Sequence, residues 1–262
     1  MRRTISIWPE FNQHWDGVTN FLMAGECAAP FNFPLPPLPD LLDIVRKDDE
    51  AKANPGAKGE RVDTTDINEQ FRKLPIDEAL RYNFRMAHYN IQKWDAPGKF
   101  LHGFKGRVFD PLQQVLRDNG FTWEWFRMYF FFSGPNCATN YHMDKSNVIA
   151  WQRYGTKVFS GLTDPGRWEP REKRMQSWTD TVRKPATLTD ADVLAYTMKP
   201  GDVLWNCLLT PHWVEATDET ACSLNFSIRG LRRNGQLCKH EEEWFDHQIK
   251  RGEPTTAASS PY

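Results

Sequence analysis

Two histidines and one aspartate in this chain have the types and the spacing of a mononuclear metal site. His142 and Asp144 stand two positions apart in a segment with strand character, so both side chains point to one face and can reach one ion. His212 lies further along the chain. Two imidazoles and one carboxylate on one side of a metal suit Fe(II) and leave coordination positions open. A His-x-Asp pair alone is more often a polar surface pair, so this hypothesis needs all three residues.

Two further residues meet the needs of a dicarboxylate cosubstrate. An Fe(II) oxygenase of this kind must neutralise the carboxylate that lies away from the metal. Lys157 follows His142 at a distance that a strand, a turn and a return strand can cover, and Thr139 offers a hydroxyl just before His142. We expect both to bind that carboxylate. Arg229 is the alternative counter-charge, in which case Lys157 is a solvated strand lysine.

These residues occur within a longer series of motifs. In chain order the series is Thr139, His142-x-Asp144, Asn147, Gly155-x-Lys157, Pro200-Gly201-Asp202-Val203-Leu204-Trp205, His212 and Asn225-Phe226. The series resembles the JmjC or cupin-like family of 2-oxoglutarate- and Fe(II)-dependent oxygenases over residues 125–230. It is especially similar to the branch that contains the asparaginyl hydroxylase acting on hypoxia-inducible factor.

The resemblance implies a fold and a set of ligands. It implies a double-stranded β-helix core, with iron bound by His142, Asp144 and His212. It also implies that Thr139 and Lys157 bind the distal carboxylate of 2-oxoglutarate. One departure is that Thr210-Pro211 stand where the family often has bulky residues before its second histidine.

The resemblance assigns further residues to the cosubstrate. Asn225 is implied to lie close to 2-oxoglutarate, and Asn147 belongs to the same motif. A tyrosine on the strand before the first histidine often helps to bind the cosubstrate in the family. Tyr129 is the candidate here, with Arg127 and Tyr141 as alternatives.

The predicted activity is hydroxylation. The enzyme is expected to use Fe(II), 2-oxoglutarate and O2 to hydroxylate an unactivated C–H bond and to release succinate and CO2, with the chemistry supplied by the metal and cosubstrate. Because Asp144 supplies a carboxylate ligand, a halogenase is disfavoured. The substrate is a small molecule or a peptide or protein side chain. Two alternatives are a non-catalytic cupin-type metal- or ligand-binding protein and a protein-directed JmjC demethylase.

Composition excludes several other classes. The net charge of −1, from 33 basic and 34 acidic residues, gives no field that would draw the chain to nucleic acid or an anionic membrane. Five scattered cysteines without CxxC spacing indicate neither a disulfide framework nor a zinc site. No signal peptide or membrane-spanning run is visible. We expect a soluble, cytoplasmic protein, and its oligomeric state is not predicted.

The elements that must position the site have strand character. Aromatic and alternating stretches at residues 122–132, 147–159, 203–205 and 221–228 predict short strands with turns between them. Such spacing is typical of an antiparallel barrel or double sheet. The predicted fold is therefore mainly β with flanking helices, in the double-stranded β-helix class.

The remaining segments are expected to surround this core as one structural domain. Residues 1–120 are expected to form an arm, a mobile loop and helices that pack on it; the loop at 47–65 could act as a lid. Helices are predicted within 66–90 and from an N-cap at Asp110 to Gly120. The core is placed at 121–238 with an insertion at about 163–192, followed at 239–262 by a helix and a disordered tail.

Overall fold

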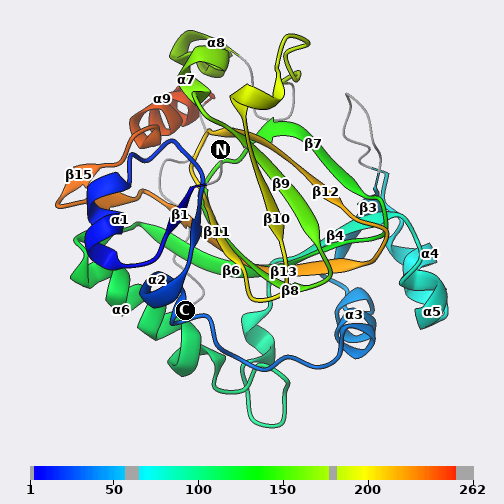
Figure 1. Ribbon diagram of the computed structural model, residues 1–262. Coiled ribbons are helices and arrows are strands. Elements are labelled where there is room, and N and C mark those ends of the chain that lie inside the picture. The colour runs from blue at the N-terminus through cyan, green and yellow to red at the C-terminus, as the bar shows by residue number, and fades with distance from the viewer. Residues whose placement is uncertain (1–2, 57–64, 177–181, 252–262) are drawn as a thin grey trace.

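Two β-sheets face each other in this protein (Figure 1). The structure, a computed structural model, describes residues 3–56, 65–176 and 182–251. The larger sheet has eight strands in the order β1-β2-β11-β8-β13-β6-β4-β3, and the smaller has four in the order β10-β9-β12-β7. Among the described strand pairs, β1 and β2 run parallel and the others are antiparallel. The predicted mainly β fold with flanking helices is confirmed.

The strands that carry the motifs make up the centre of both sheets. In the larger sheet they are β6 (Trp125–Ser133), β8 (Asn147–Tyr154), β11 (Val203–Asn206) and β13 (Ala221–Arg229). The smaller sheet contains β7 (Ala138–Met143), β9 (Lys157–Leu162), β10 (Val193–Met198) and β12 (Pro211–Ala216). Gly155 separates β8 from β9 with a φ of 62°, and a Cβ there would stand 2.6 Å from the Thr220 carbonyl oxygen, so only glycine fits this turn.

The N-terminal segment contributes strands as well as the expected arm and helices. The larger sheet is extended by β1 (Thr4–Ile5), β2 (Phe21–Met23), β3 (Lys52–Pro55) and β4 (Phe84–His88). Two predictions are therefore wrong in part. The 47–65 segment contains β3 rather than only a loop, while its residues 57–64 lie outside the described residues. The helical reading of 66–90 fails from Phe84 on, because β4 pairs with both β3 and β6.

Helices cover the outside of the sheets. They are α1 (Trp8–His14), α2 (Gly25–Ala28), α3 (Leu38–Arg46), α4 (Asn68–Lys73), α5 (Ile76–Ala79), α6 (Asp110–Asp118), α7 (Pro165–Trp168), α8 (Arg171–Gln176) and α9 (Glu241–Arg251). Shorter elements are the 3-10 turns Gln92–Trp94 and Asp190–Asp192, the π turn Lys105–Phe109, and a small sheet of β5 (Phe121–Thr122), β14 (Arg232–Arg233) and β15 (Gln236–Leu237).

Two predicted helical features differ in detail. Asp110 is not an N-cap, because a π turn runs directly into α6 and Asp110 is itself helical. The predicted insertion at 163–192 carries α7 and α8, while its residues 177–181 are not described. The predicted terminal helix is confirmed as α9, and the tail from residue 252 lies outside the described part of the chain.

Side chains of β6 point alternately into the hydrophobic core and into the space between the two sheets. The even-numbered side chains of β6 are buried among aromatic and aliphatic side chains from α3 and α6, which lie on the outer side of the larger sheet (Figure 1). The odd-numbered side chains point to the opposite face, between the two sheets. The largest fully buried side chains of the protein are aromatic, in keeping with its content of Trp and Phe.

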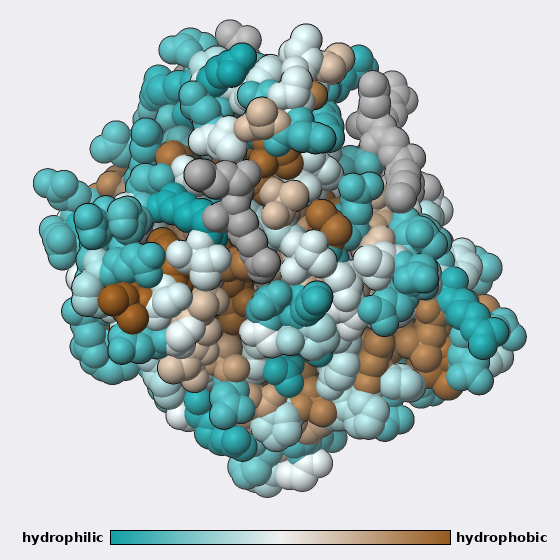
Figure 2. Space-filling view, in the orientation of Figure 1, coloured by the Kyte–Doolittle hydropathy of each residue, from teal (hydrophilic) through white to brown (hydrophobic). Residues whose placement is uncertain are grey.

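The outer surface is mostly polar. In the view of Figure 2 hydrophilic residues predominate and hydrophobic ones show in separate patches. Within the described ranges the exposed large hydrophobic residues are Ile7, Ile44, Tyr89 and Ile249. No described helix combines the length and apolarity needed to cross a membrane.

A buried carboxylate anchors α9 to the larger sheet. Glu241 is fully buried and accepts hydrogen bonds from the backbone N–H groups of Gly230 and Leu231, at 3.1 and 3.0 Å, and from the Asn147 side-chain amide at 3.2 Å. Buried donors that lose their acceptor are strongly destabilising. Glu241 thus fixes the start of α9 against the end of β13.

This anchor predicts an asymmetry between neighbouring glutamates. Glu241→Ala leaves buried donors unpaired and should lower the free energy of unfolding by about 2–4 kcal/mol. Glu242→Ala changes an exposed residue and should alter it by less than about 0.5 kcal/mol. Urea denaturation monitored by Trp fluorescence measures both. Equal stability of the two variants would show that α9 is held by other contacts.

Candidate active site

The pairing of two strands brings the candidate metal ligands together. In the antiparallel register of β7 and β12, His142 lies directly opposite His212, and a bulge follows in β12. Asp144 comes immediately after β7. Its carboxylate oxygens lie 3.5 Å from the Nε2 atoms of both histidines, and the imidazole centroids are 4.1 Å apart. One donor atom from each residue lies within 4.8 Å of the others, a grouping that could hold a metal ion.

Backbone hydrogen bonds orient both imidazoles. His142 Nδ1 lies 2.7 Å from the Asn140 carbonyl oxygen, and His212 Nδ1 lies 2.9 Å from the Thr210 carbonyl oxygen. A carbonyl can only accept, so each Nδ1 carries the proton and donates it. Each Nε2 lone pair then points toward Asp144, which is the arrangement that metal-binding histidines need.

Burial and mutual attraction set the charges of these groups. Burial lowers the pKa of His212 to about 4, with the nearby His142 adding to the effect. Burial alone would raise the pKa of Asp144, but His212, His142 and a 2.8 Å hydrogen bond from the Asn206 amide together lower it to about 2. At neutral pH the group therefore offers a neutral imidazole and a carboxylate, the protonation states that bind metal.

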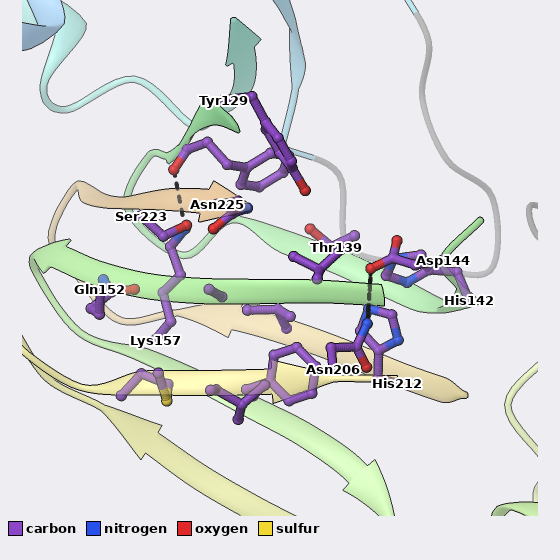
Figure 3. Close-up of a pocket in the computed structure, with 17 residues that line it drawn as sticks. Tyr129, Thr139, His142, Asp144, Gln152, Lys157, Asn206, His212, Ser223 and Asn225 are labelled. Atoms are coloured by element: carbon purple, nitrogen blue, oxygen red, sulfur yellow. Dashed lines mark hydrogen bonds and ion pairs between the residues drawn. The ribbon is translucent and has the colours of Figure 1, made fainter. Parts of the chain in front are cut away.

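A cavity of about 110 Å³ extends from these residues into the space between the sheets. Figure 3 shows His142, Asp144 and His212 at one end and Lys157 toward the other. Asp144 is the one acidic residue in its lining. Its walls are mostly apolar, and the described residues that line it are Tyr129, Phe131, Thr139, His142, Asp144, Val148, Ala150, Gln152, Lys157, Phe159, Met198, Leu204, Asn206, His212, Val214, Ser223 and Asn225.

Lys157 is a buried cation with little to balance it. Its side chain is at the start of β9, and the residue is 4% exposed. The ammonium makes a long hydrogen bond of 3.4 Å to the Phe131 carbonyl oxygen and lies 5.0 Å from the centre of that ring. No carboxylate pairs with it among the described residues, and burial lowers its pKa to about 8. A buried charge of this kind favours an anionic ligand.

The structure brings most of the other predicted residues to this cavity. Thr139, Tyr129 and Asn225 line it together with Lys157 (Figure 3). Tyr129 and Asn225 are opposite each other in the β6–β13 register. The side-chain amide oxygen of Asn225 is buried without a hydrogen-bond partner in the described chain, so it can accept a hydrogen bond from a bound molecule.

Three candidates lie elsewhere. Asn147 bonds to Glu241 and to the Leu208 N–H, which directs it toward the α9 anchor and away from the cavity. Arg229, the alternative counter-charge, lies over the rings of Trp125 and Trp244 at the far end of β13, because β13 carries it beyond the cavity. Tyr141, an alternative to Tyr129, donates to Glu169 instead.

Sequence reasoning missed several lining residues. Asn206 supports Asp144 directly and follows the Pro-Gly-Asp turn strand that the motif analysis already marked. Gln152 and Ser223 lie beside Lys157 at the deep end of the cavity (Figure 3). Gln152 is two residues from Ala150, and Ser223 is two residues from Asn225, so each lies on the same strand face as another lining residue. This spacing is the sequence signal that could have found them.

A second cluster of possible metal ligands is explained by ion pairing. Asp48, Glu50 and His88 lie close enough to hold an ion. Lys93, however, lies 2.6 Å from Asp48 and 3.7 Å from Glu50, while His88 contacts Asp48 at 2.8 Å. A lysine ammonium within the cluster makes a cation site unfavourable, because like charges repel.

The buried charge of Lys157 predicts a stability difference that depends on pH. A folded-state pKa of about 8, below the usual 10.5, means that the charged side chain destabilises the fold by about 3 kcal/mol below pH 8. Between about pH 8 and 10.5 the unfolded chain binds more protons, so the stability of the wild type rises. Lys157→Met should therefore have a higher free energy of unfolding than the wild type at pH 7. This difference between the two proteins should shrink toward pH 10.

Urea denaturation at pH 7 and at pH 9.5 measures this effect. Lys199→Met removes an exposed lysine and serves as the control that should show no such gap. A Lys157→Met variant that is clearly less stable than the wild type at pH 7 would show that the ammonium is well compensated in the fold.

Comparison with known proteins supports the fold. No protein-family model matches the chain, and no curated protein sequence does. Among solved structures it is similar to YcfD, a ribosomal oxygenase from Escherichia coli, with a TM-score of 0.53, 16% identity, and coverage of 100% of this chain and 61% of that one.

The same neighbour has also been solved with ligands. A structure of YcfD in complex with cobalt and 2-oxoglutarate matches with a TM-score of 0.55 and 16% identity over 100% of this chain and 61% of that one. This chain thus spans about 60% of the length of the structures it resembles. At this level of identity the likeness establishes the shared fold, which is the predicted double-stranded β-helix.

Proposed function

We propose that this protein is a 2-oxoglutarate- and Fe(II)-dependent oxygenase that hydroxylates a C–H bond of its substrate. The observation that carries the proposal is one cavity with a His-Asp-His group at one end and a buried, unpaired lysine at the other. A metal-chelating dicarboxylate needs this combination. The likeness of the fold to a ribosomal oxygenase that binds cobalt and 2-oxoglutarate supports it.

The donor set fits Fe(II). His142, Asp144 and His212 would hold the metal through two neutral nitrogens and one carboxylate oxygen, a set that suits iron and leaves room for other ligands. The described residues around them add no thiolate that would favour zinc. Asn206, through its hydrogen bond to Asp144, would fix the carboxylate in place.

The opposite end of the cavity fits the distal carboxylate of 2-oxoglutarate. Lys157 would supply the charge and Thr139 a hydroxyl, while Asn225 and Tyr129 would line the middle of the molecule. An ammonium without a protein carboxylate beside it is balanced when a ligand supplies one. Asn147 and Arg229 have no part in this proposal.

The protein's own contribution is position and exclusion of water. Bound together, Fe(II) and 2-oxoglutarate would supply the electrons that activate O2 for attack on a C–H bond. Phe131, Phe159 and Val214 line the cavity and keep water from the reacting groups. Phe159 also stacks on His212 with ring centroids 4.9 Å apart, which restrains the imidazole.

The substrate is narrowed by analogy alone. The neighbouring structures are of a ribosomal oxygenase, which favours a protein side chain over a small molecule. Within the JmjC or cupin-like class, the motifs of this chain favour the branch of the asparaginyl hydroxylase. Hydroxylation of a peptide or protein side chain is therefore the proposed reaction.

Metal affinity should fall more when a ligand is removed than when a residue that supports a ligand is removed. Titration calorimetry with Co(II) on the apo protein should show one site in the wild type. Asn206→Ala removes only a supporting hydrogen bond and should weaken binding roughly 10–100-fold, whereas His212→Ala should weaken it further. His102→Ala, an exposed histidine, is the control. Unchanged Co(II) affinity in His212→Ala would place the metal elsewhere.

Cosubstrate binding should depend on Lys157 and on pH. Lys157→Met should keep metal affinity and lose at least about 100-fold in 2-oxoglutarate affinity, because it removes a buried ionic contact. In the wild type the affinity should fall as pH rises through about 8, since Lys157 then loses its proton.

The measurement is 2-oxoglutarate binding by calorimetry, together with succinate formation by NMR in the presence of Fe(II) and O2. Lys199→Met is again the control. A wild-type protein that binds metal but neither binds 2-oxoglutarate nor forms succinate is the result expected of the non-catalytic cupin-type alternative.

A further inference from the structure

The inner face of the larger sheet continues beyond the cosubstrate cavity. Phe131 and Tyr129 line that cavity, and two residues further along the same face of β6 comes Arg127. The register across the sheet pairs Arg127 with Ser227, Ser227 with Val148, and Val148 with Asn206. Arg127 therefore lies in register with Asn206, whose side-chain amide donates to Asp144. This places Arg127 at the same height along the strands as the candidate metal ligands.

Two aromatic rings hold the Arg127 guanidinium. Its central carbon lies 4.9 Å from the centre of the Tyr89 ring and 4.3 Å from that of Trp125. Such contacts fix the plane of the guanidinium and leave its N–H groups at the edge. Its Nε is buried without a hydrogen-bond partner, and Arg127 forms no ion pair with a carboxylate among the described residues.

A second cavity opens at this point. It has a volume of about 480 Å³ and is lined by Glu50, Lys52, Tyr89, Asn90, Gln92 and Arg127. Its one carboxylate is already engaged, because Glu50 accepts a 3.0 Å hydrogen bond from Asn90 and lies 3.7 Å from Lys93. Of the two cations in its lining, Lys52 is exposed to water, whereas Arg127 has a buried nitrogen without a described partner.

Two tyrosines in ring contact connect the cavities. Tyr89 and Tyr129 have ring centroids 5.0 Å apart. Tyr89 lines this second cavity, termed the outer cavity. Tyr129 lines the inner cavity, which contains the candidate metal ligands and Lys157. Tyr89 is 39% exposed, so the outer cavity is reached from solvent. A molecule in the outer cavity would lie beside the candidate metal ligands without entering the space between them and Lys157.

We propose that Arg127, held between Tyr89 and Trp125, binds a carboxylate group of the substrate at the entrance to the metal centre. The proposal rests on the proposed function, since it is that function which makes the adjoining cavity an oxygenase site. A planar guanidinium with free edge donors matches a carboxylate in two parallel hydrogen bonds. The two rings lower the local dielectric beside the guanidinium, which strengthens the contact. Arg127 is thus a specificity-determining residue for an acidic substrate.

A pair of matched probes tests the carboxylate preference. 4-Fluorophenylacetate and its neutral amide differ only in the acid group, and 19F NMR measures the binding of each to the protein loaded with Mn(II) and 2-oxoglutarate without O2. The acid should bind the wild type at least about tenfold more tightly than the amide, a difference of about 1.4 kcal/mol. The same comparison between peptides that carry Glu or Gln distinguishes a free acid from an acidic side chain.

Variants assign the preference to a residue. Arg127→Met should abolish the acid-over-amide preference, and Arg127→Lys should restore part of it. Arg117→Met removes another arginine that lies over a ring, 4.9 Å from the centre of Trp123, and should leave the preference intact. The urea midpoint and the Co(II) affinity of Arg127→Met should stay close to the wild-type values, which separates this role from a general loss of structure.

The outcomes decide between the two proposals. No acid preference in the wild type, or an equal preference in Arg127→Met, overturns the subsite. A preference that is lost in Lys157→Met but kept in Arg127→Met overturns it as well, because the probe then occupies the inner cavity. If Arg127 carries the preference and the protein does not bind 2-oxoglutarate, the subsite stands and the proposed function fails.

Discussion

The pairing of β7 with β12 is the contact on which the site depends. It places His142 opposite His212 and brings their imidazole centroids to 4.1 Å. Two rings can pack this closely beside a carboxylate only if they are not both charged. The structure meets that condition because burial keeps His212 neutral. Both Nδ1–H groups donate hydrogen bonds to backbone carbonyls, which sets the tautomer. The strand register therefore fixes position, tautomer and charge together.

Charge is distributed unevenly along the cavity. The one lining carboxylate, that of Asp144, is at the end where the two histidines lie, and Lys157 stands alone toward the other end. Among the described residues, no lysine or arginine pairs with Asp144 and no carboxylate pairs with Lys157. A chelated metal with a dicarboxylate supplies both counter-charges. The buried lysine destabilises the fold, and the large aromatic core offsets this, as is common where binding requires an unfavourable group.

The parts of this structure that depend on local pattern could be predicted, and those that depend on tertiary contacts could not. Strand alternation marked β6 and β13, and residue types marked His142 and Asp144. Residues 80–87 show helical spacing, yet β4 forms there because β3 and β6 pair with it. The series of motifs included Asn147, but the buried Glu241 determines where its amide points. Nothing local distinguishes Arg229 from Lys157 as a counter-charge, since only the sheet register shows which reaches the cavity.

The two unpaired cations suit different tasks because of where they lie and how they are shaped. Lys157 is a compact charge at the deep end of a cavity of about 110 Å³ between the two sheets. Arg127 is planar, is fixed between rings, and borders an outer cavity of about 480 Å³ that opens to solvent. If both the cosubstrate and the substrate carry carboxylates, a single basic site would bind either one. Separate sites, one deep at Lys157 on β9 and one at the entrance at Arg127 on β6 of the facing sheet, would keep the substrate from displacing the cosubstrate and would present its C–H bond to the metal side of the cavity.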